Sequence, residues 1–233
     1  IGQYGDGNQV IDMTLGFDAW QTARAEESSN FRREWRKAEK LIEADTTLVR
    51  HDVIDPQSFD RLLALKRDAY AQSGHFDIFQ LAWPRSLLEQ LSKTGDDNAR
   101  GVLSPLSIDG EPAAMVYCMR SATALHYWFP AYEPKFAKQK PGLALLFTLV
   151  KWAALEGLQE VHLGLGNSQY KRQMASWMMP VRAGALALSP VQQYATEFTS
   201  WGTRIEGRNR FSSVPAKYAR KYERMALSGS WRA

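Results

Sequence analysis

Cysteine and histidine are scarce in this chain, which contains one cysteine, Cys118, and four histidines. A single cysteine cannot form a disulfide within the chain, and no Cys/His group has the spacing of a zinc site. We therefore expect neither a disulfide framework nor a bound metal. Cys118 is not expected to be a nucleophile, because it lies in a predicted strand, where cysteine usually serves as a small buried side chain.

Long hydrophobic runs are also missing. A largely apolar stretch covers only residues 143–150, whereas a membrane-spanning helix needs about 20 residues. No charged segment followed by an apolar one begins the chain, so we expect no signal peptide, no membrane span and a cytoplasmic location. The chain begins at Ile1 rather than at methionine, which fits a fragment of a longer protein.

A strong excess of one charge is absent as well. The 29 Lys and Arg residues against 25 Asp and Glu give a net charge of +4, too small to indicate nucleic-acid binding unless the charges cluster. What the chain does have is 45% hydrophobic residues, a share typical of an ordered globular protein. At 233 residues it is long enough for one large domain or two small ones.

Periodicity and turn residues predict a mixed α/β chain. Asp109 and Gly110 form a strong hairpin signal between two of the strands. The strand, helix and strand at 124–130, 143–156 and 160–165 form a crossover unit, which predicts a parallel strand pair. The predicted helices cover 17–43, 55–74, 80–93, 143–156, 191–205 and the region after 213, and the other strands cover 47–54, 101–108, 113–121 and 181–188.

A basic loop at 135–142 precedes the apolar helix, and it is a candidate anion site. Lys135, Lys138 and Lys140 lie in this loop, and Gly142 would let a ligand approach the backbone closely. A helix N-terminus presents unpaired N–H groups and a partial positive charge, which suits a pyrophosphate. The loop has no P-loop or GxGxxG signature, so a plain solvated loop is the alternative.

The segment after the crossover strand is the second candidate. Gly164 and Gly166 free the backbone there, and Tyr170 can donate a proton to a leaving group. The alternative is a Tyr170 and Lys171 pair that only anchors the sheet.

Three side chains on the two crossover strands leave similar alternatives. His162 alternates with apolar neighbours, so it is either a core histidine or a general base. Tyr127 and Trp128 lie on opposite faces of their strand, where each either walls a cleft or packs in the core.

The order of these segments carries a family resemblance. The run from Tyr132 and Pro134 through Pro141-Gly142 to Gly164, Gly166 and Tyr170-Lys171 resembles the GNAT-like acetyltransferases of the CelD/BcsL type, which are associated with cellulose or exopolysaccharide biosynthesis. The chain is also similar to the FemABX aminoacyl transferases. The resemblance covers about residues 10–190.

The resemblance implies a GNAT-like acyl-CoA N-acyltransferase fold of the α/β (α+β) class, with about six mostly antiparallel strands. It implies acetyl-CoA as co-substrate, a sugar, polysaccharide precursor or small metabolite as acceptor, and no metal. Tyr170 would be the acid, Lys171 would orient acceptor or phosphate, and His162 would be the base. The residues implied to hold the cofactor are Tyr127, Trp128, Lys138, Lys140, Gly142 and Leu143.

The resemblance also bears on domain organisation. We expect an N-terminal lead-in at 1–45, the GNAT-like domain at 46–190 and packing helices at 191–233. Relatives often carry acidic residues where this chain has His162 and Asn167, and they often have a preceding GNAT-like half. We therefore expect the acceptor cleft to need a partner domain or a second copy.

Two other functions stay open at this stage. In the first, a FemABX-like enzyme draws an aminoacyl group from tRNA, which would bind the basic helices at 32–40 and 204–224. In the second, the chain is a non-catalytic module that has lost its donor site.

Overall fold

The computed structural model describes residues 2–3, 7–53 and 55–183. Residues 4–181 form one compact unit, and residues 1–3 with 182–233 form another. In the described part of the second unit, β1 (Gly2–Gln3) pairs antiparallel with β9 (Arg182–Ala183). The helices predicted at 191–233, and the predicted strand beyond residue 183, lie outside the described residues.

The larger unit is built on a sheet in the order β3-β4-β5-β6-β7-β2-β8. Every neighbouring pair is antiparallel except β6 and β7, which run parallel as the crossover predicts. The mixed, mostly antiparallel sheet is therefore confirmed, with one strand more than expected. Its strands are β2 (Asn8–Asp12), β3 (Thr47–Val49), β4 (Arg100–Ile108), β5 (Glu111–Arg120), β6 (Ala124–Tyr132), β7 (Glu160–Leu165) and β8 (Trp177–Met179).

The hairpin between β4 and β5 forms where the sequence places it. Asp109 and Gly110 have φ angles of 53° and 76°. Positive φ at both central residues is what a two-residue turn needs to match the twist of the flanking strands, and Asp-Gly tolerates it best.

The crossover helix α5 (Pro141–Leu155) begins two residues before the predicted start. Pro141 occupies its first turn, where the missing N–H is harmless and the fixed φ favours a helix. The predicted basic loop is mostly a 3₁₀ helix, η2 (Pro134–Gln139). Its end at Lys140, with a φ of 53°, turns the chain into α5.

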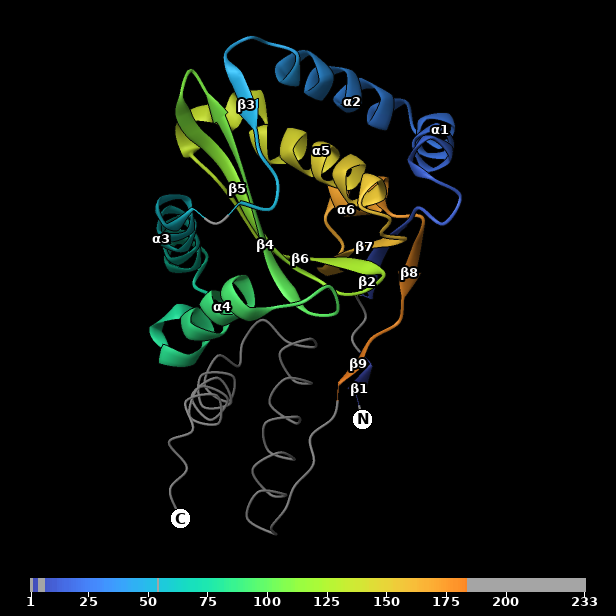
Figure 1. Cartoon of the computed structure of the whole chain (residues 1–233). Helices are drawn as coiled ribbons and strands as arrows, with labels where there is room; N and C mark the ends of the chain where they lie inside the picture. Colours follow the sequence, from blue (N-terminus) through green and yellow to red (C-terminus); the bar gives the residue numbers. More distant parts are fainter. Residues whose placement is uncertain (1, 4–6, 54, 184–233) are drawn as a thin grey trace, which may run out of the picture. The chain divides into compact units, whose positions relative to one another are not determined.

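Helices cover both faces of the sheet (Figure 1). On one face α5 packs on β4, β5 and β6, and α1 (Phe17–Glu27) and α2 (Ser29–Ile42) pack on α5. On the other face lie α3 (Pro56–Ser73) and α4 (Ala82–Thr94), joined by the short helix η1 (Ile78–Gln80). The helical region predicted at 17–43 breaks at Ser28, whose hydroxyl caps α2 by accepting from the N–H of Phe31.

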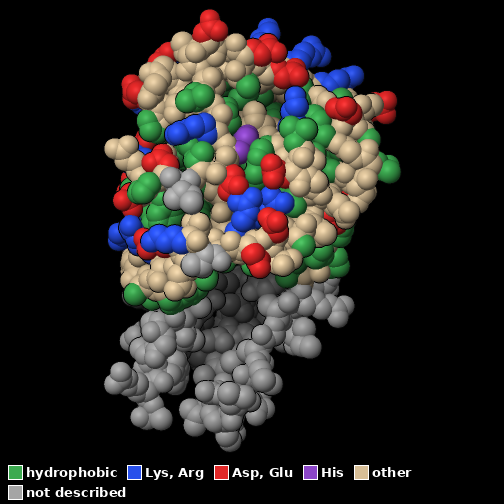
Figure 2. Space-filling model, viewed as in Figure 1, with side chains coloured by type: hydrophobic (Ala, Val, Ile, Leu, Met, Phe, Trp, Pro, Cys, Tyr) green, Lys and Arg blue, Asp and Glu red, His purple; other side chains and the backbone are tan. Residues whose placement is uncertain are grey.

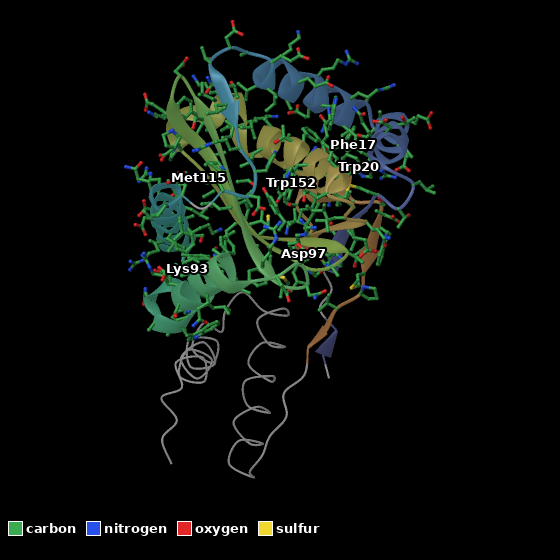
Figure 3. The ribbon with its side chains drawn as sticks, viewed as in Figure 1. Phe17, Trp20, Lys93, Asp97, Met115 and Trp152 are labelled. Carbon is green, nitrogen blue, oxygen red and sulfur yellow. The ribbon has the colours of Figure 1, made fainter. Side chains whose placement is uncertain are left out.

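Aromatic side chains join the three helices on the α5 face. Phe17 and Trp20 of α1 lie side by side next to α5, with ring centres 5.7 Å apart (Figure 3). Trp35 of α2 meets Phe147 of α5 at 4.6 Å in an edge-to-face arrangement, which is favourable for aromatic rings. This layer fixes α5, and therefore its N-terminus, against the sheet.

Candidate active site

The strands β6 and β7 diverge after the third residue of β6. They pair only at Ala124↔Glu160, Leu125↔Val161 and His126↔His162, although β6 continues to residue 132 and β7 to residue 165. Just past this point β6 carries a bulge, because Cys118 pairs with Tyr127 whereas Tyr117, the residue before it on β5, pairs with Phe129. A bulge bends its strand, so β6 turns away from β7. We call the region between the two strands beyond this last pair the wedge.

The two glycines at the end of β7 shape one side of this wedge. Gly164 and Gly166 have φ angles of 79° and 106°, which side chains other than glycine rarely adopt. A Cβ at either position would lie 3.8 to 3.9 Å from Nζ of Lys171. Lys171 donates a hydrogen bond of 2.6 Å to the carbonyl of Leu165, and burial lowers the pKa of its ammonium group.

Tyr170, on the short helix α6 (Gln169–Met174), packs partly buried against the core on the α5 face. Burial raises the pKa of its hydroxyl, opposed by a hydrogen bond with Ser168. Tyr127 is fully enclosed in the same core, and burial raises its pKa well above the usual value. Both tyrosines therefore stay protonated at neutral pH. Trp128, the extra residue of the bulge, is 38% exposed.

The N-terminus of α5 lies at the end of the loop that follows β6. No side chain among the described residues caps this helix. The N–H of Leu143 donates to the carbonyl of Lys140, whereas that of Gly142 lies in the first turn, where a helix offers no partner. A Cβ at Gly142 would meet only Tyr132, at 3.8 Å, so space is open above this peptide.

The lysines of the preceding loop differ in what they contact. Lys135 pairs with Glu111, and Nζ of Lys140 lies 2.6 Å from a carboxylate oxygen of Glu34 on α2. Glu34 is only 6% exposed, and its hydrogen bond with Lys140 lowers the pKa of its carboxyl group. Lys138 is exposed and has no ion pair with any described residue. Of the predicted anion-binding residues, Lys138, Lys140 and Gly142 lie at or next to the N-terminal end of α5. Lys140 already has Glu34 as an ion-pair partner there.

His162, in the last pair between β6 and β7, belongs to a polar network. Its Nδ1 is 2.8 Å from the amide nitrogen of Asn8, and its Nε2 is 2.8 Å from a carboxylate oxygen of Glu160. The side-chain oxygen of Asn8 accepts from the N–H of Gly164. The ring of His126 lies beside that of His162, with centres 4.8 Å apart.

Sequence reasoning missed Asn8, Glu160 and His126 as members of this network. Asn8 gives no local signal, since it reaches His162 only through the pairing of β2 with β7. His126 and His162 could have been matched from the predicted parallel pair, in which they occupy facing positions.

Hollows elsewhere on the surface do not coincide with these residues. One of about 620 Å³ is lined by Phe17, Lys151 and Leu155 among others, and one of about 330 Å³ by Gln21 and Arg32 among others. The candidate site is thus defined by the wedge between β6 and β7, not by a deep pocket.

Charge and metal chemistry can also be examined over the described residues. On the face in Figure 2, basic and acidic side chains are intermixed and form no continuous patch of one sign. Within residues 2–3, 7–53 and 55–183, no group of three or more His, Cys, Asp and Glu side chains is placed to hold a metal. No helix in the same ranges has the length and apolar content to cross a membrane.

A family model described as an acetyltransferase (GNAT) domain matches residues 27–172. The chain matches no curated protein sequence.

Solved structures resemble the fold at low sequence identity. One is the C-terminal domain (DUF2156) of a putative lysylphosphatidylglycerol synthetase from Agrobacterium fabrum, with a TM-score of 0.51 and 12% identity over 77% of this chain and 59% of that one. Another is FemX, with a TM-score of 0.54 and 12% identity over 70% of this chain and 53% of that one. The chain therefore spans little more than half the length of these structures.

Proposed function

The chain belongs to the acetyltransferase (GNAT) domain family, and from this premise we propose that it transfers an acyl group from acyl-CoA, with acetyl-CoA as the expected donor, to a hydroxyl or an amine. The observation that carries the proposal is the wedge between β6 and β7. It begins after the pair of His126 and His162. The end of β6 on one side of it leads toward α5, and the end of β7 on the other side leads to α6 with Tyr170. Ligands commonly dock where neighbouring strands diverge in this way.

The donor's pyrophosphate fits the N-terminus of α5. Phosphates bind at helix N-termini because unpaired N–H groups and the helix dipole both favour an anion. The uncapped end, the open space above Gly142 and the unpaired charge of Lys138 meet those needs. The pantetheine arm would then extend along the wedge, beside Tyr127.

Catalysis in this arrangement depends mainly on positioning. A peptide N–H group of β6 beyond His126 would stabilise the oxyanion that forms on the thioester carbonyl. Tyr170 supplies a proton to the departing thiolate, a role that suits a hydroxyl kept protonated by burial. Lys171, beside Gly164 and Gly166, orients the acceptor or a phosphate.

A saccharide is the acceptor that the resemblance to the CelD/BcsL type supports. An amino sugar such as glucosamine offers both a hydroxyl and an amine, so it is a suitable probe for the acceptor side.

Aminoacyl transfer is the second candidate function. Lys140 is already bound to Glu34, which leaves fewer free cations at the proposed pyrophosphate site. The fold is also similar to that of FemX. If an aminoacyl-tRNA were the donor, binding would weaken steeply with salt, because phosphate contacts release counterions.

The test compares donors directly. Purified chain is incubated with glucosamine and either acetyl-CoA or aminoacyl-tRNA, and the product is followed by mass spectrometry. We expect product from acetyl-CoA, with Tyr170→Phe lowering turnover at least about tenfold while CoA affinity stays within about twofold. An unchanged rate in Tyr170→Phe would show that Tyr170 is not the acid. If only aminoacyl-tRNA gives product, the donor is aminoacyl-tRNA and not acetyl-CoA.

A further inference from the structure

The histidine pair, His126 and His162, lies at the apex of the wedge on the face of the sheet opposite α5. Leu125, Tyr127 and their neighbours on β7 belong to the core on the α5 face. Side chains alternate along a strand, so His126 and His162 lie on the other face. The histidine pair is therefore the last pair of residues at which β6 and β7 meet, and it lies where a bound acyl group would be reached from that face.

Hydrogen bonds assign the tautomer of His162. The N–H of Gly164 can only donate, so the side-chain oxygen of Asn8 must accept from it. The NH₂ group of Asn8 then faces Nδ1 of His162, which must be the unprotonated nitrogen. The remaining proton is on Nε2 and is donated to Glu160. Both ring nitrogens of His162 are therefore occupied by partners within the protein.

His126 differs from its partner in this respect. Over the described residues, no hydrogen bond engages its ring nitrogens, although the ring is partly buried. A partly buried imidazole without a partner at a strand divergence is available to a ligand.

We propose that His126, not His162, is the general base that takes the proton from the acceptor. The inference rests on the proposed function. The acceptor N or O forms a bond to the thioester carbon while its proton passes to a ring nitrogen of His126. The C–S bond then breaks, and the thiolate takes a proton from Tyr170. Water returns a proton to Tyr170 and removes one from His126, so the net products are the acylated acceptor and the free thiol.

The network around His162 assists this role as a positioning device. The titratable groups that face His126 are His162 and Glu160 of β7, while its partner on β5 is Met119. The Glu160 carboxylate favours the cation that His126 becomes when it takes up a proton. Burial and the neighbouring His162 lower the pKa of His126, whereas Glu160 raises it. His126 is therefore mostly neutral at pH 7, as a base must be.

The kinetic test uses two probe acceptors with acetyl-CoA. The amine of glucosamine is largely protonated at neutral pH and must give up that proton before it can attack, whereas hydroxylamine is already uncharged there, so its attack on a thioester depends far less on a base. We expect His126→Gln to lower glucosamine-dependent release of CoA at least about tenfold. Hydroxylamine-dependent release and the Kd for CoA should stay within about twofold. His75→Gln, which changes an exposed histidine, is the control and should match the wild type.

Equal loss with both probes would overturn the base assignment, since hydroxylamine depends far less on a base than glucosamine does. No loss in His126→Gln would overturn it as well. If the wild-type chain binds no CoA, the proposed function fails instead, so the two failures are distinguishable.

A second measurement needs no turnover. Proton–carbon NMR of the full chain follows the histidine rings across pH, with the His126 signal identified by its absence in His126→Gln. We expect this signal to titrate below the ordinary histidine range, to move to lower pH in Glu160→Gln, and to shift when acetyl-CoA is added. The inference would be contradicted if the His126 signal titrated in the ordinary histidine range and changed neither in Glu160→Gln nor on addition of acetyl-CoA.

Discussion

Two glycines show how single residues differ in role: one is needed for packing within the fold, and the other leaves space for a ligand. Gly101 is the first of these. The hydroxyl of Tyr117 passes over it to donate to the carbonyl of Leu88 at 2.7 Å. A Cβ on Gly101 would contact this hydroxyl and lie 2.6 Å from the ring carbon that bears it. Gly142 is the second, since a Cβ there has room.

Gly101→Ala should therefore lower the free energy of unfolding by about 3 kcal/mol, because the core is overpacked and a buried hydroxyl loses its partner. Urea denaturation measures this change. Gly142→Ala is the matched control and should stay within about 0.5 kcal/mol of the wild type. Equal stability of the two variants would contradict the packing described around Tyr117.

His51 makes stability depend on pH. Burial lowers the pKa of its imidazole to about 4, and its Nδ1 lies 3.1 Å from the hydroxyl of Ser104. The unfolded chain takes up a proton near the ordinary pKa of about 6.5, so stability falls as pH drops from there toward 4.

We expect His51 to remove up to about 2 kcal/mol of stability between pH 7 and pH 5. Urea denaturation of the wild type and His51→Asn at both values measures the difference. His126 contributes in the same direction, so the variant should retain a smaller slope. If the slope is unchanged in His51→Asn, His51 is not the group responsible.

At the scale of elements, local signals in the sequence were sufficient for the parts of the fold near the wedge. Asp109-Gly110, the apolar run of α5 and the short strand β7 each carry their own pattern, and the structure has all three. The strand β8 and the burial of Glu34 could not be predicted in the same way. β8 has three residues and forms by pairing with β2, and Glu34 is neutralised by Lys140, which is 106 residues away.

The same distinction applies to the candidate site. Tyr170, Lys138 and Gly142 follow from local sequence, because they flank predicted strands and helices. The environment of His162 does not, since it depends on Asn8, 154 residues away in the chain. Pairing between strands far apart in the sequence decides whether a polar side chain in a strand has hydrogen-bond partners within the protein or remains available to a ligand.

The N-terminus of α5 makes a prediction about charge. Lys138→Ala should weaken CoA binding several-fold, about 1 kcal/mol, because one unpaired cation near the helix end is lost. Calorimetric titration with CoA at low and physiological salt measures it. Lys151→Ala, which removes an exposed charge further along α5, should bind as the wild type does. Lys140→Ala is a poorer choice, since it would leave Glu34 buried without its main partner. Equal affinities of the Lys138 and Lys151 variants for CoA would show that the pyrophosphate does not bind beside Lys138.

At the scale of the whole molecule, the chain spans little more than half the length of the solved structures it resembles. Its described residues nevertheless include the sheet from β3 to β8, the wedge between β6 and β7, and the N-terminus of α5. These parts all lie in the unit formed by residues 4–181. The residues proposed to bind the donor therefore lie within one unit, and we expect that unit to bind CoA.

The most direct test of this account is calorimetric titration of the purified chain with acetyl-CoA, in the wild type and in Gly142→Ala. We predict micromolar binding by the wild type and at least tenfold weaker binding by Gly142→Ala, with both proteins equally stable, because the added Cβ fills the space above the first turn of α5. A well-folded wild type that binds no acetyl-CoA would contradict the account.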